Sequence, residues 1–300
     1  DYLMRVGEYW AARGIDGWRL DVPEEIKTPG FWEEFRERTR AINPDLYIVG
    51  EIWGDASGYI NEGTRFDGTM NYPLTTATIA FTVGDRLDTK TMMDNPYYNV
   101  APAIDAEGFR ERIQWLLGHY PEPAHLANLN LLDSHDTARI LTIASGDEDS
   151  VVLALTLLLT FPGAPSIYYG TEVGLEGGRD PDSRRSFPWG HEGHWNERIR
   201  SAVKELIALR HQHPALRSPN YSVLCSTGDS DGSMMHVASR IADGEQLLVV
   251  VNAGRERETM SLVCCENADL LWGNGELTVG ENQARISMGP RSAAIWHLDG

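Results

Sequence analysis

The chain has 300 residues, 42% hydrophobic and 23% charged, and its 26 basic and 44 acidic side chains give a formal net charge of −18. A chain of this length buries about three quarters of its unfolded surface, so it can form a core without disulfides or metals. The negative charge repels phosphate backbones and anionic lipid, so we expect no nucleic-acid or membrane partner. It does not bear on binding of an uncharged substrate.

The cysteines and the ends of the chain bear on its location. Cys225, Cys264 and Cys265 form neither a metal-ligand spacing nor an even set for disulfides, which favours reduced thiols and a cytoplasmic protein. The longest apolar run, residues 151–161, is shorter than the roughly 20 residues that cross a bilayer. The sequence begins at Asp1, without a methionine and within a predicted helix, so we expect it to be a fragment.

Up to about residue 213 the sequence alternates between segments typical of helices and of strands. Helices are predicted over residues 2–12, 29–42, 107–117, 148–161 and 196–211, and strands over residues 15–22, 46–52, 66–72, 128–134 and 165–169. In the second helix we expect Thr28 as the N-cap and a buried face with Trp32, Phe35, Thr39 and Ile42. Apolar strands alternating with helices predict a parallel sheet covered on both faces.

After Pro214 the pattern changes to short alternating segments separated by Gly, Asp and Asn. Strands are predicted over residues 221–226, 234–239, 246–252, 259–263 and 292–297. We therefore expect an antiparallel β-sandwich domain over residues 216–300, after a larger domain over residues 1–215. The tail contains no recognisable chemical motif.

Three predicted strands end in charged residues, where parallel α/β folds carry their catalytic groups. The first ends in Arg19-Leu20-Asp21, so Arg19 and Asp21 lie on the same face. A guanidinium beside Asp21 would keep that carboxylate ionised, as a nucleophile must be. The alternative is a structural ion pair, which is the commoner role of such a pair alone.

The other two strand ends also carry acids. Glu51 leaves an apolar strand near Trp53, and burial there would raise its pKa and suit it to general-acid catalysis; a plain strand-edge residue is the alternative. The third strand runs into Ser134-His135-Asp136-Thr137, where His135 and Asp136 would bind sugar hydroxyls. That segment could instead be a turn or helix cap. Two carboxyls about 5–5.5 Å apart, one ionised and one protonated, are typical of a retaining glycosidase.

These runs also carry a family resemblance. Residues 14–21, 49–53 and 134–137 resemble three motifs, in order, of the α-amylase family, glycoside hydrolase family 13. Residues 163–170 resemble its eighth-strand motif, and residues 180–189 resemble the loop that follows. The resemblance covers residues 1–215, and the tail resembles the family's C-terminal sandwich.

The resemblance implies a fold and a mechanism. The fold would be the C-terminal part of a (β/α)8 TIM barrel, about strands 4–8, followed by the sandwich domain. Asp21 would be the nucleophile, Glu51 the acid/base, and Asp136 the residue that binds sugar hydroxyls and stabilises the transition state. The substrate would be an α-glucan such as a maltodextrin, a cyclodextrin or starch, cleaved with retention by double displacement. Further substrate contacts would come from Arg19, Glu25, Trp53, His135, Asp180 and Arg185.

Departures from typical α-amylases narrow this expectation. Glu24, Glu25 and Ser134 resemble the neopullulanase and cyclomaltodextrinase branch, in which the position of Glu25 lies near the acceptor subsite. Trp53, Tyr72 and Trp189 could stack on pyranose rings or simply pack. The alternatives are an exo-α-glucosidase or a trehalose-forming isomerase of the same family, and a non-catalytic amylase-like protein.

The family's first three strands and its substrate-binding histidine have no match in this sequence. We therefore expect the fragment alone to be poorly folded or inactive. The resemblance implies no cofactor for the chemistry; a structural calcium in the missing N-terminal part and a homodimer of the full-length protein are open.

Overall fold

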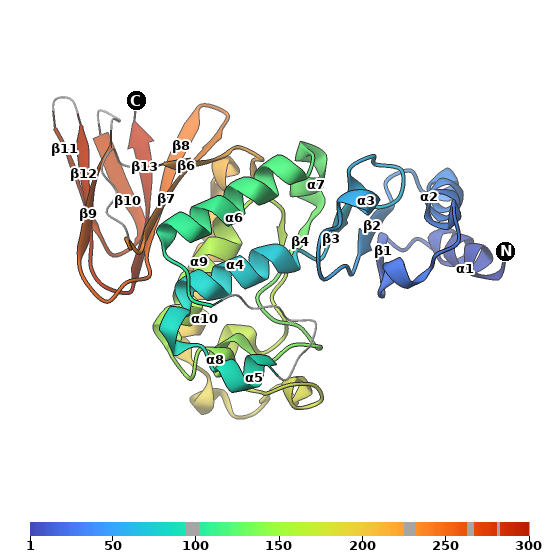
Figure 1. The fold of residues 1–300 in the computed structure, drawn as a ribbon, viewed down its shortest axis with the longest axis horizontal. Helices are drawn as coiled ribbons and strands as arrows, with labels where there is room; N and C mark the ends of the chain where they lie inside the picture. Colours follow the sequence, from blue (N-terminus) through green and yellow to red (C-terminus); the bar gives the residue numbers. More distant parts are fainter. Residues whose placement is uncertain (94–101, 225–231, 263–266, 281–282, 300) are drawn as a thin grey trace.

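A computed structural model describes residues 1–93, 102–224, 232–262, 267–280 and 283–299. Figure 1 shows the first helices and strands at one end, a helical middle and an antiparallel β-structure at the other end. The α-helices are α1 (Tyr2–Ala11), α2 (Phe31–Ile42), α3 (Ser57–Ile60), α4 (Tyr72–Thr82), α5 (Thr89–Met93), α6 (Ala106–His119), α7 (Glu122–Ala127), α8 (Ile140–Ile143), α9 (Glu148–Thr160) and α10 (Glu197–Gln212). Within the described ranges, none of them is both long and apolar enough to cross a membrane.

Five parallel strands form the wall of a partial barrel. They are β1 (Gly17–Leu20), β2 (Tyr47–Gly50), β3 (Gly68–Thr69), β4 (Leu129–Asn130) and β5 (Ala164–Pro165). β1, β2 and β3 pair in that order, β4 pairs with β5, and a parallel bridge from Met70 to Leu129 joins the two groups. Helices follow the strands as in a (β/α) barrel. Each of the five predicted strands overlaps an observed one, which confirms the C-terminal part of a TIM barrel, but β3, β4 and β5 have only two residues each and are shorter than predicted.

One helix contradicts the sequence analysis. Residues 66–72 are predicted as a strand, but β3 ends at Thr69 and α4 begins at Tyr72. Asn71 caps α4 by accepting a hydrogen bond from the Leu74 N–H, and Pro73 lies in its first turn. Nine of the 11 residues of α4 are buried, so it has no polar face from which a helical period could be recognised.

The start of α2 is a second correction. Its N-cap is Gly30, with φ 75°, rather than Thr28. Glycine adopts this left-handed conformation without the steric penalty that a Cβ brings. Trp32 and Phe35 are buried as predicted, but Ile42 is the last helical residue and is 43% exposed, so its assignment to the core face is wrong.

The C-terminal region is an antiparallel β-sandwich, as predicted. One sheet has the order β10-β13-β8-β7-β6 and the other β11-β12-β9. The strands are β6 (Tyr221–Leu224), β7 (Met235–Ala242), β8 (Glu245–Asn252), β9 (Glu258–Leu262), β10 (Asn267–Gly273), β11 (Glu276–Val279), β12 (Ala284–Met288) and β13 (Ser292–Asp299). β10, β11 and β12 were not predicted. The three cysteines lie outside the described residues.

Strand β8 is buried on both faces because it separates two cores. Leu248 and Val250 pack inside the sandwich. Leu247 and Val249 belong instead to the core that contains helix α9 of the barrel. At the end of the strand, the buried Asn252 amide donates hydrogen bonds to the carbonyls of Glu256 and Gly289, and its oxygen accepts one from the Gly254 N–H.

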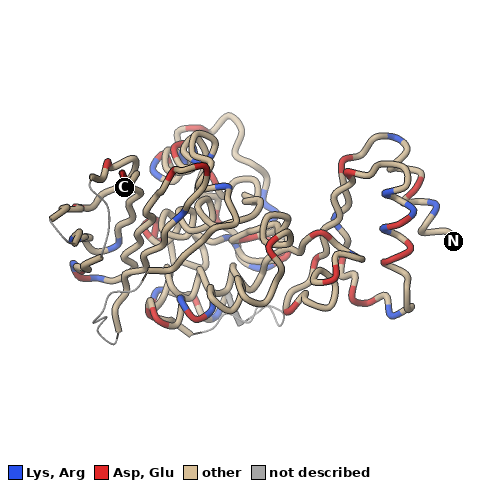
Figure 2. The backbone as a smooth tube through the Cα atoms, turned by 90° about the horizontal axis from the view of Figure 1, so that it is seen from above, with Lys and Arg blue, Asp and Glu red and all other residues tan. Residues whose placement is uncertain are grey.

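Charged groups also join the barrel to the sandwich. Asp147, just before α9, lies 2.9 Å from Arg86 Nε and 3.0 Å from Arg291 Nη2. Arg86 ends a 3-10 helix of the barrel part, whereas Arg291 lies between β12 and β13. Burial tends to raise the pKa of Asp147, but a hydrogen bond from Ser150 and the two arginines lower it overall. Figure 2 shows acidic and basic positions mixed in both parts of the chain.

Candidate active site

Strand register brings two acidic residues to the same edge of the sheet. Leu20 and Gly50, the last residues of β1 and β2, are paired. Glu51 follows Gly50 directly, and its N–H donates to the Leu20 carbonyl at 2.9 Å. Asp21 follows Leu20 directly. Both carboxylates therefore leave the carboxyl ends of neighbouring parallel strands, where barrel enzymes carry their active sites.

A single guanidinium bridges these two acids. Arg19 Nη1 lies 2.6 Å from Asp21 Oδ1, and Arg19 Nη2 lies 2.5 Å from Glu51 Oε1. The Asp21 side chain is 77% exposed, whereas that of Glu51 is 3% exposed. The site thus holds one solvated and one buried carboxyl group, and both form an ion pair with Arg19.

The environment of Glu51 favours its protonated form. Burial raises its pKa, and the negative charges of Asp136 and Asp21 add to this. A hydrogen bond from the Val22 N–H and the charge of Arg19 oppose the rise without cancelling it. A carboxyl group whose pKa is raised can donate a proton at a pH where an ordinary glutamate is ionised.

Val22 is a part of the site that the sequence analysis missed. Its N–H donates to Glu51 Oε2 at 3.2 Å, and its backbone is left-handed, with φ 30° and ψ 56°. A β-branched residue rarely adopts this conformation, and such strain gathers at functional sites. The turn leads into the 3-10 helix η1 (Pro23–Glu25), which Trp32 anchors by donating to the Pro23 carbonyl. Valine gives no sequence signal for such a turn.

The segment after β4 forms a tight polar turn. The Ser134 N–H donates to Thr137 Oγ1 at 2.8 Å, and the Asp136 N–H donates to Ser134 Oγ at 3.2 Å. His135 Nε2 lies 3.0 Å from Asp136 Oδ2. The negative charge of Asp136 also contributes to the raised pKa of Glu51.

The loop over residues 180–185 reaches this turn through a different arginine from the one predicted. Arg184 Nη2 lies 3.2 Å from Asp136 Oδ1, and Arg184 Nε lies 2.9 Å from Asp180 Oδ1. Arg185 instead forms a bidentate ion pair with Asp182. The structure thus links Asp180 to Asp136 through Arg184, and the role of Arg185 in substrate binding stays a prediction. The two arginines are adjacent in an irregular loop, so no helical or strand periodicity in the sequence indicates which of them contacts Asp136.

The aromatic residues predicted to stack on sugar rings, and Glu25, differ in how exposed they are. Trp53 stacks flat on Tyr72, with ring centroids 3.9 Å apart. Tyr72 is buried, so it supports Trp53 and is not itself available for a sugar ring. Trp189 is 73% exposed in the loop after β5, and Glu25 is exposed at the end of η1.

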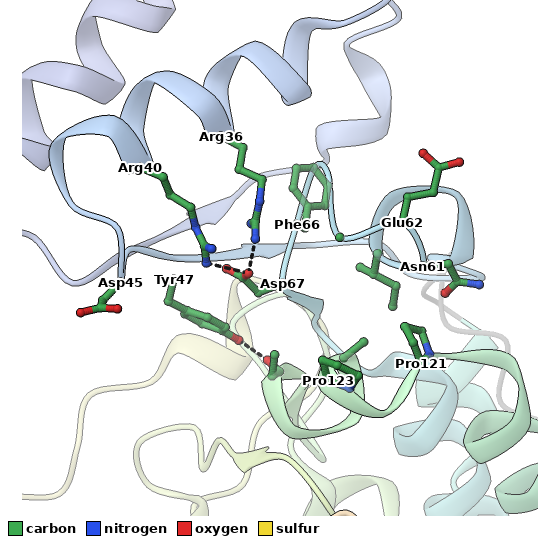
Figure 3. A pocket seen from close by; sticks show the side chains of 14 residues that line it. Arg36, Arg40, Asp45, Tyr47, Asn61, Glu62, Phe66, Asp67, Pro121 and Pro123 are labelled. Atoms are coloured by element: carbon green, nitrogen blue, oxygen red, sulfur yellow. Dashed lines mark hydrogen bonds and ion pairs between the residues drawn. The ribbon is translucent and has the colours of Figure 1, made fainter.

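A separate cavity of about 490 Å³ lies near the opposite ends of β2 and β3 (Figure 3). Arg36 and Arg40 each approach Asp67 Oδ1 at 2.8 Å, and the Tyr47 hydroxyl donates to the Ala127 carbonyl. These polar groups hold each other, and the cavity is not part of the candidate site. Among the residues that the structure describes, no cluster of three or more His, Cys, Asp or Glu is placed to hold a metal ion.

Comparisons with known proteins identify the family of this chain. The family model "Alpha amylase, catalytic domain" matches residues 1–208. A cyclomaltodextrinase of Geobacillus thermopakistaniensis (strain MAS1) is 39% identical over 257 residues, 85% of this chain and 40% of that protein. Neopullulanase 2 of Thermoactinomyces vulgaris is 36% identical over 299 residues, 98% of this chain and 47% of that protein.

The chain is also similar to a solved structure. The native debranching enzyme of Nostoc punctiforme superposes with a TM-score of 0.91 at 47% identity, over 99% of this chain and 61% of that one. The chain spans less than half the length of the two curated relatives. The extent of the family match, together with the likeness in sequence and structure, shows that the chain belongs to the α-amylase family, glycoside hydrolase family 13.

Proposed function

We propose that the protein containing this chain is a retaining glycoside hydrolase that acts on α-glucosidic linkages of maltodextrins, cyclodextrins and related glucans. One observation carries the proposal: Arg19 holds an exposed Asp21 and a buried Glu51 whose pKa is raised. Retaining glycosidases need such a pair, one group ionised and one protonated. The chemistry uses side chains of this chain and needs no cofactor.

In the first step Asp21 is the nucleophile. Its carboxylate attacks the anomeric carbon while Glu51 gives its proton to the departing glycosidic oxygen. The bond to that oxygen breaks, a glycosyl ester forms on Asp21, and Glu51 is left ionised. Arg19 stays close to both groups and stabilises the negative charge as it moves to Glu51.

In the second step Glu51 is the base. It takes a proton from water, the water oxygen attacks the anomeric carbon, and the ester bond to Asp21 breaks with overall retention. The pKa of Glu51 changes in the useful direction, since the negative charge of Asp21 contributes to raising it. That contribution disappears in the neutral ester, and Glu51 becomes easier to ionise.

The turn after β4 supplies binding groups. Asp136 and His135 would hold sugar hydroxyls, with Arg184 fixing the orientation of Asp136. Charged groups that hold a reacting sugar in one orientation contribute through proximity as well as charge. Trp53 would support a pyranose ring above Tyr72.

The Glu51→Gln variant tests the proposal in the full-length protein. We expect release of reducing sugar from maltodextrin to fall by about 10²–10⁴-fold, because the amide cannot protonate the leaving oxygen. Glu62→Gln, which alters an exposed glutamate beside the separate cavity, should leave the rate unchanged. Undiminished activity in the Glu51 variant would reject the catalytic assignment.

A panel of substrates, tested with the wild-type protein, distinguishes the main proposal from a second candidate function. Debranching of glucans is favoured by the 47% identity to a protein named a debranching enzyme. Cleavage of a cyclodextrin supports the main proposal and contradicts an exo-acting or isomerising enzyme. Cleavage confined to a branched glucan supports the second candidate.

A further inference from the structure

Asp133 is a buried carboxylate that the proposed mechanism does not use. It lies just before the Ser134–Thr137 turn, and only 3% of its surface is exposed. Its Oδ2 accepts a hydrogen bond from the Ile140 N–H at 3.0 Å. The Thr171 hydroxyl lies 2.9 Å and 2.8 Å from its two oxygens, so it can donate to either one.

Thr171 connects this carboxylate to a fully buried arginine. Arg139 Nη1 donates to Thr171 Oγ1 at 3.3 Å and to the Tyr169 carbonyl at 2.5 Å. Arg139 Nε donates to the Ser183 carbonyl at 2.8 Å, and the guanidinium lies 4.0 Å from the centre of the Tyr168 ring. The arginine thus joins the segment after β4 to the two segments that follow β5.

The same network ends at the groups that would bind sugar. Ser183 Oγ and Arg184 Nε donate to the His135 carbonyl at 3.1 Å and 2.9 Å. Arg184 Nη2 then reaches Asp136 at 3.2 Å. A continuous set of contacts therefore leads from Asp133 through Thr171, Arg139 and Ser183 back to the turn that begins one residue after Asp133.

We propose that Asp133 is a positioning residue: its carboxylate holds Thr171 and Arg139, and through them fixes the turn and the loop that carry His135, Asp136 and Arg184. This inference rests on the proposed function. Arg139 Nη2 is buried without a hydrogen-bond partner in the described part of the chain. The charge of Asp133 compensates a guanidinium that its hydrogen bonds satisfy only in part.

The charge state of Asp133 can be changed under ordinary assay conditions. Burial raises its pKa to about 6, against the opposing effects of the Ile140 N–H, the Thr171 hydroxyl and the Arg139 charge. Glu172, on the 3-10 helix that begins at Thr171, adds to the rise. Lowering the pH through about 6 therefore removes the charge that faces Arg139.

The Asp133→Asn variant of the full-length protein tests the inference, since it keeps the shape and removes the charge. At pH 7.5 we expect KM for a linear maltodextrin to rise by about tenfold, the size of one lost hydrogen bond, with kcat within about twofold. Between pH 7.5 and 5 KM should rise more in the wild type than in the variant, because only the wild type protonates Asp133 in this range. His135 is present in both proteins, so the difference between them isolates Asp133.

Two further variants provide a second test of the network and a control. Thr171→Val removes the connecting hydroxyl and should raise KM in the same way, whereas Asp105→Asn, at the N-cap of α6, should not. An Asp133 variant with wild-type KM and wild-type pH dependence overturns the inference, as does a loss confined to kcat at every pH. Affinity for maltotriose, measured by calorimetry, tests the inference without turnover. Absent turnover in the wild type rejects the proposed function, but an affinity that Asp133→Asn leaves unchanged rejects this inference.

Discussion

The same type of side chain behaves differently at three places around the candidate site. Asp21 is solvated beside Arg19, Glu51 is buried beside the same guanidinium, and Asp133 is buried where Thr171 and a backbone N–H are its hydrogen-bond donors. Burial of a carboxylate disfavours its charged form unless partners compensate. Residues held against this preference gather at functional sites.

This preference makes stability at Asp133 depend on pH. Its pKa is raised from 3.8 to about 6 in the folded protein. The folded state therefore binds the proton more tightly, and the resulting stability is present below pH 3.8 and is lost as the pH rises through 6. Above that pH the ionised group lowers the free energy of unfolding by on the order of 3 kcal/mol.

We therefore expect Asp133→Asn to be more stable than the wild type at pH 8, by on the order of 1–3 kcal/mol. The gain should shrink toward zero by about pH 4, where the wild-type carboxyl is neutral as well. Urea unfolding at both pH values measures this difference. Equal differences at pH 8 and pH 4 would show that the charge of Asp133 does not affect stability.

At the scale of elements, helix α9 shows how a buried helix end is satisfied. The last carbonyl groups of a helix lack partners within it. Arg210, on α10, donates to the carbonyls of Leu159 and Phe161 at 2.9 and 3.2 Å and to that of Gly163 at 2.5 Å. Burial lowers the pKa of Arg210 to about 10, so it remains protonated at neutral pH.

Arg210→Met should reduce the free energy of unfolding by about 3–5 kcal/mol, because several buried carbonyls lose their donor together. Arg198→Met is the matched control on the same helix. Arg198 pairs with Asp149 at the surface, and its side chain is 54% exposed, so its loss should change stability by less than about 1 kcal/mol. Chemical unfolding monitored by circular dichroism compares the two. Similar losses in both variants would contradict the role given to Arg210.

For the molecule as a whole, the barrel part and the sandwich share an apolar interface. Val249 of β8 and Ile295 of β13 lie in the same core as Leu155 and Leu158 of α9. Asp147 adds a polar contact across the junction through Arg86 and Arg291. An interface that is buried and largely apolar favours unfolding of both parts together.

Val249→Asp would place an unpaired charge in this shared core and lower the free energy of unfolding by several kcal/mol. We expect hydrogen exchange to increase in both α9 and β8, because each loses packing against the other. Thr278→Asp, on an exposed position of β11, should alter neither segment. Faster exchange limited to the sandwich would show that the two parts unfold independently.

Sequence analysis identified the charged residues that follow β1 and β2 better than it predicted loops and buried helices. Asp21 and Glu51 could be identified because polar residues end apolar strands, a pattern set by the parallel sheet. Helix α4 could not, since burial on all sides removes the polar face that reveals a helix. Strand β10 was missed because its register shifts between Leu270 and Trp272, which interrupts the alternation. The left-handed Val22 has no local sequence signal.

Strand β8 has one more consequence. Moving a strand by one residue exchanges its two faces, and hydrophobic contrast normally prevents this. In β8 either core could accommodate Val249, Val250 and Val251. The two faces of the strand therefore differ little in hydrophobicity, and this difference does little to prevent a shift in register. The correct alignment is favoured instead by Asn252, because its side-chain amide donates to the carbonyls of Met288 and Gly289, and a shift of β8 would break these hydrogen bonds. A polar residue at the edge of the sheet thus helps to fix the register of its most apolar strand.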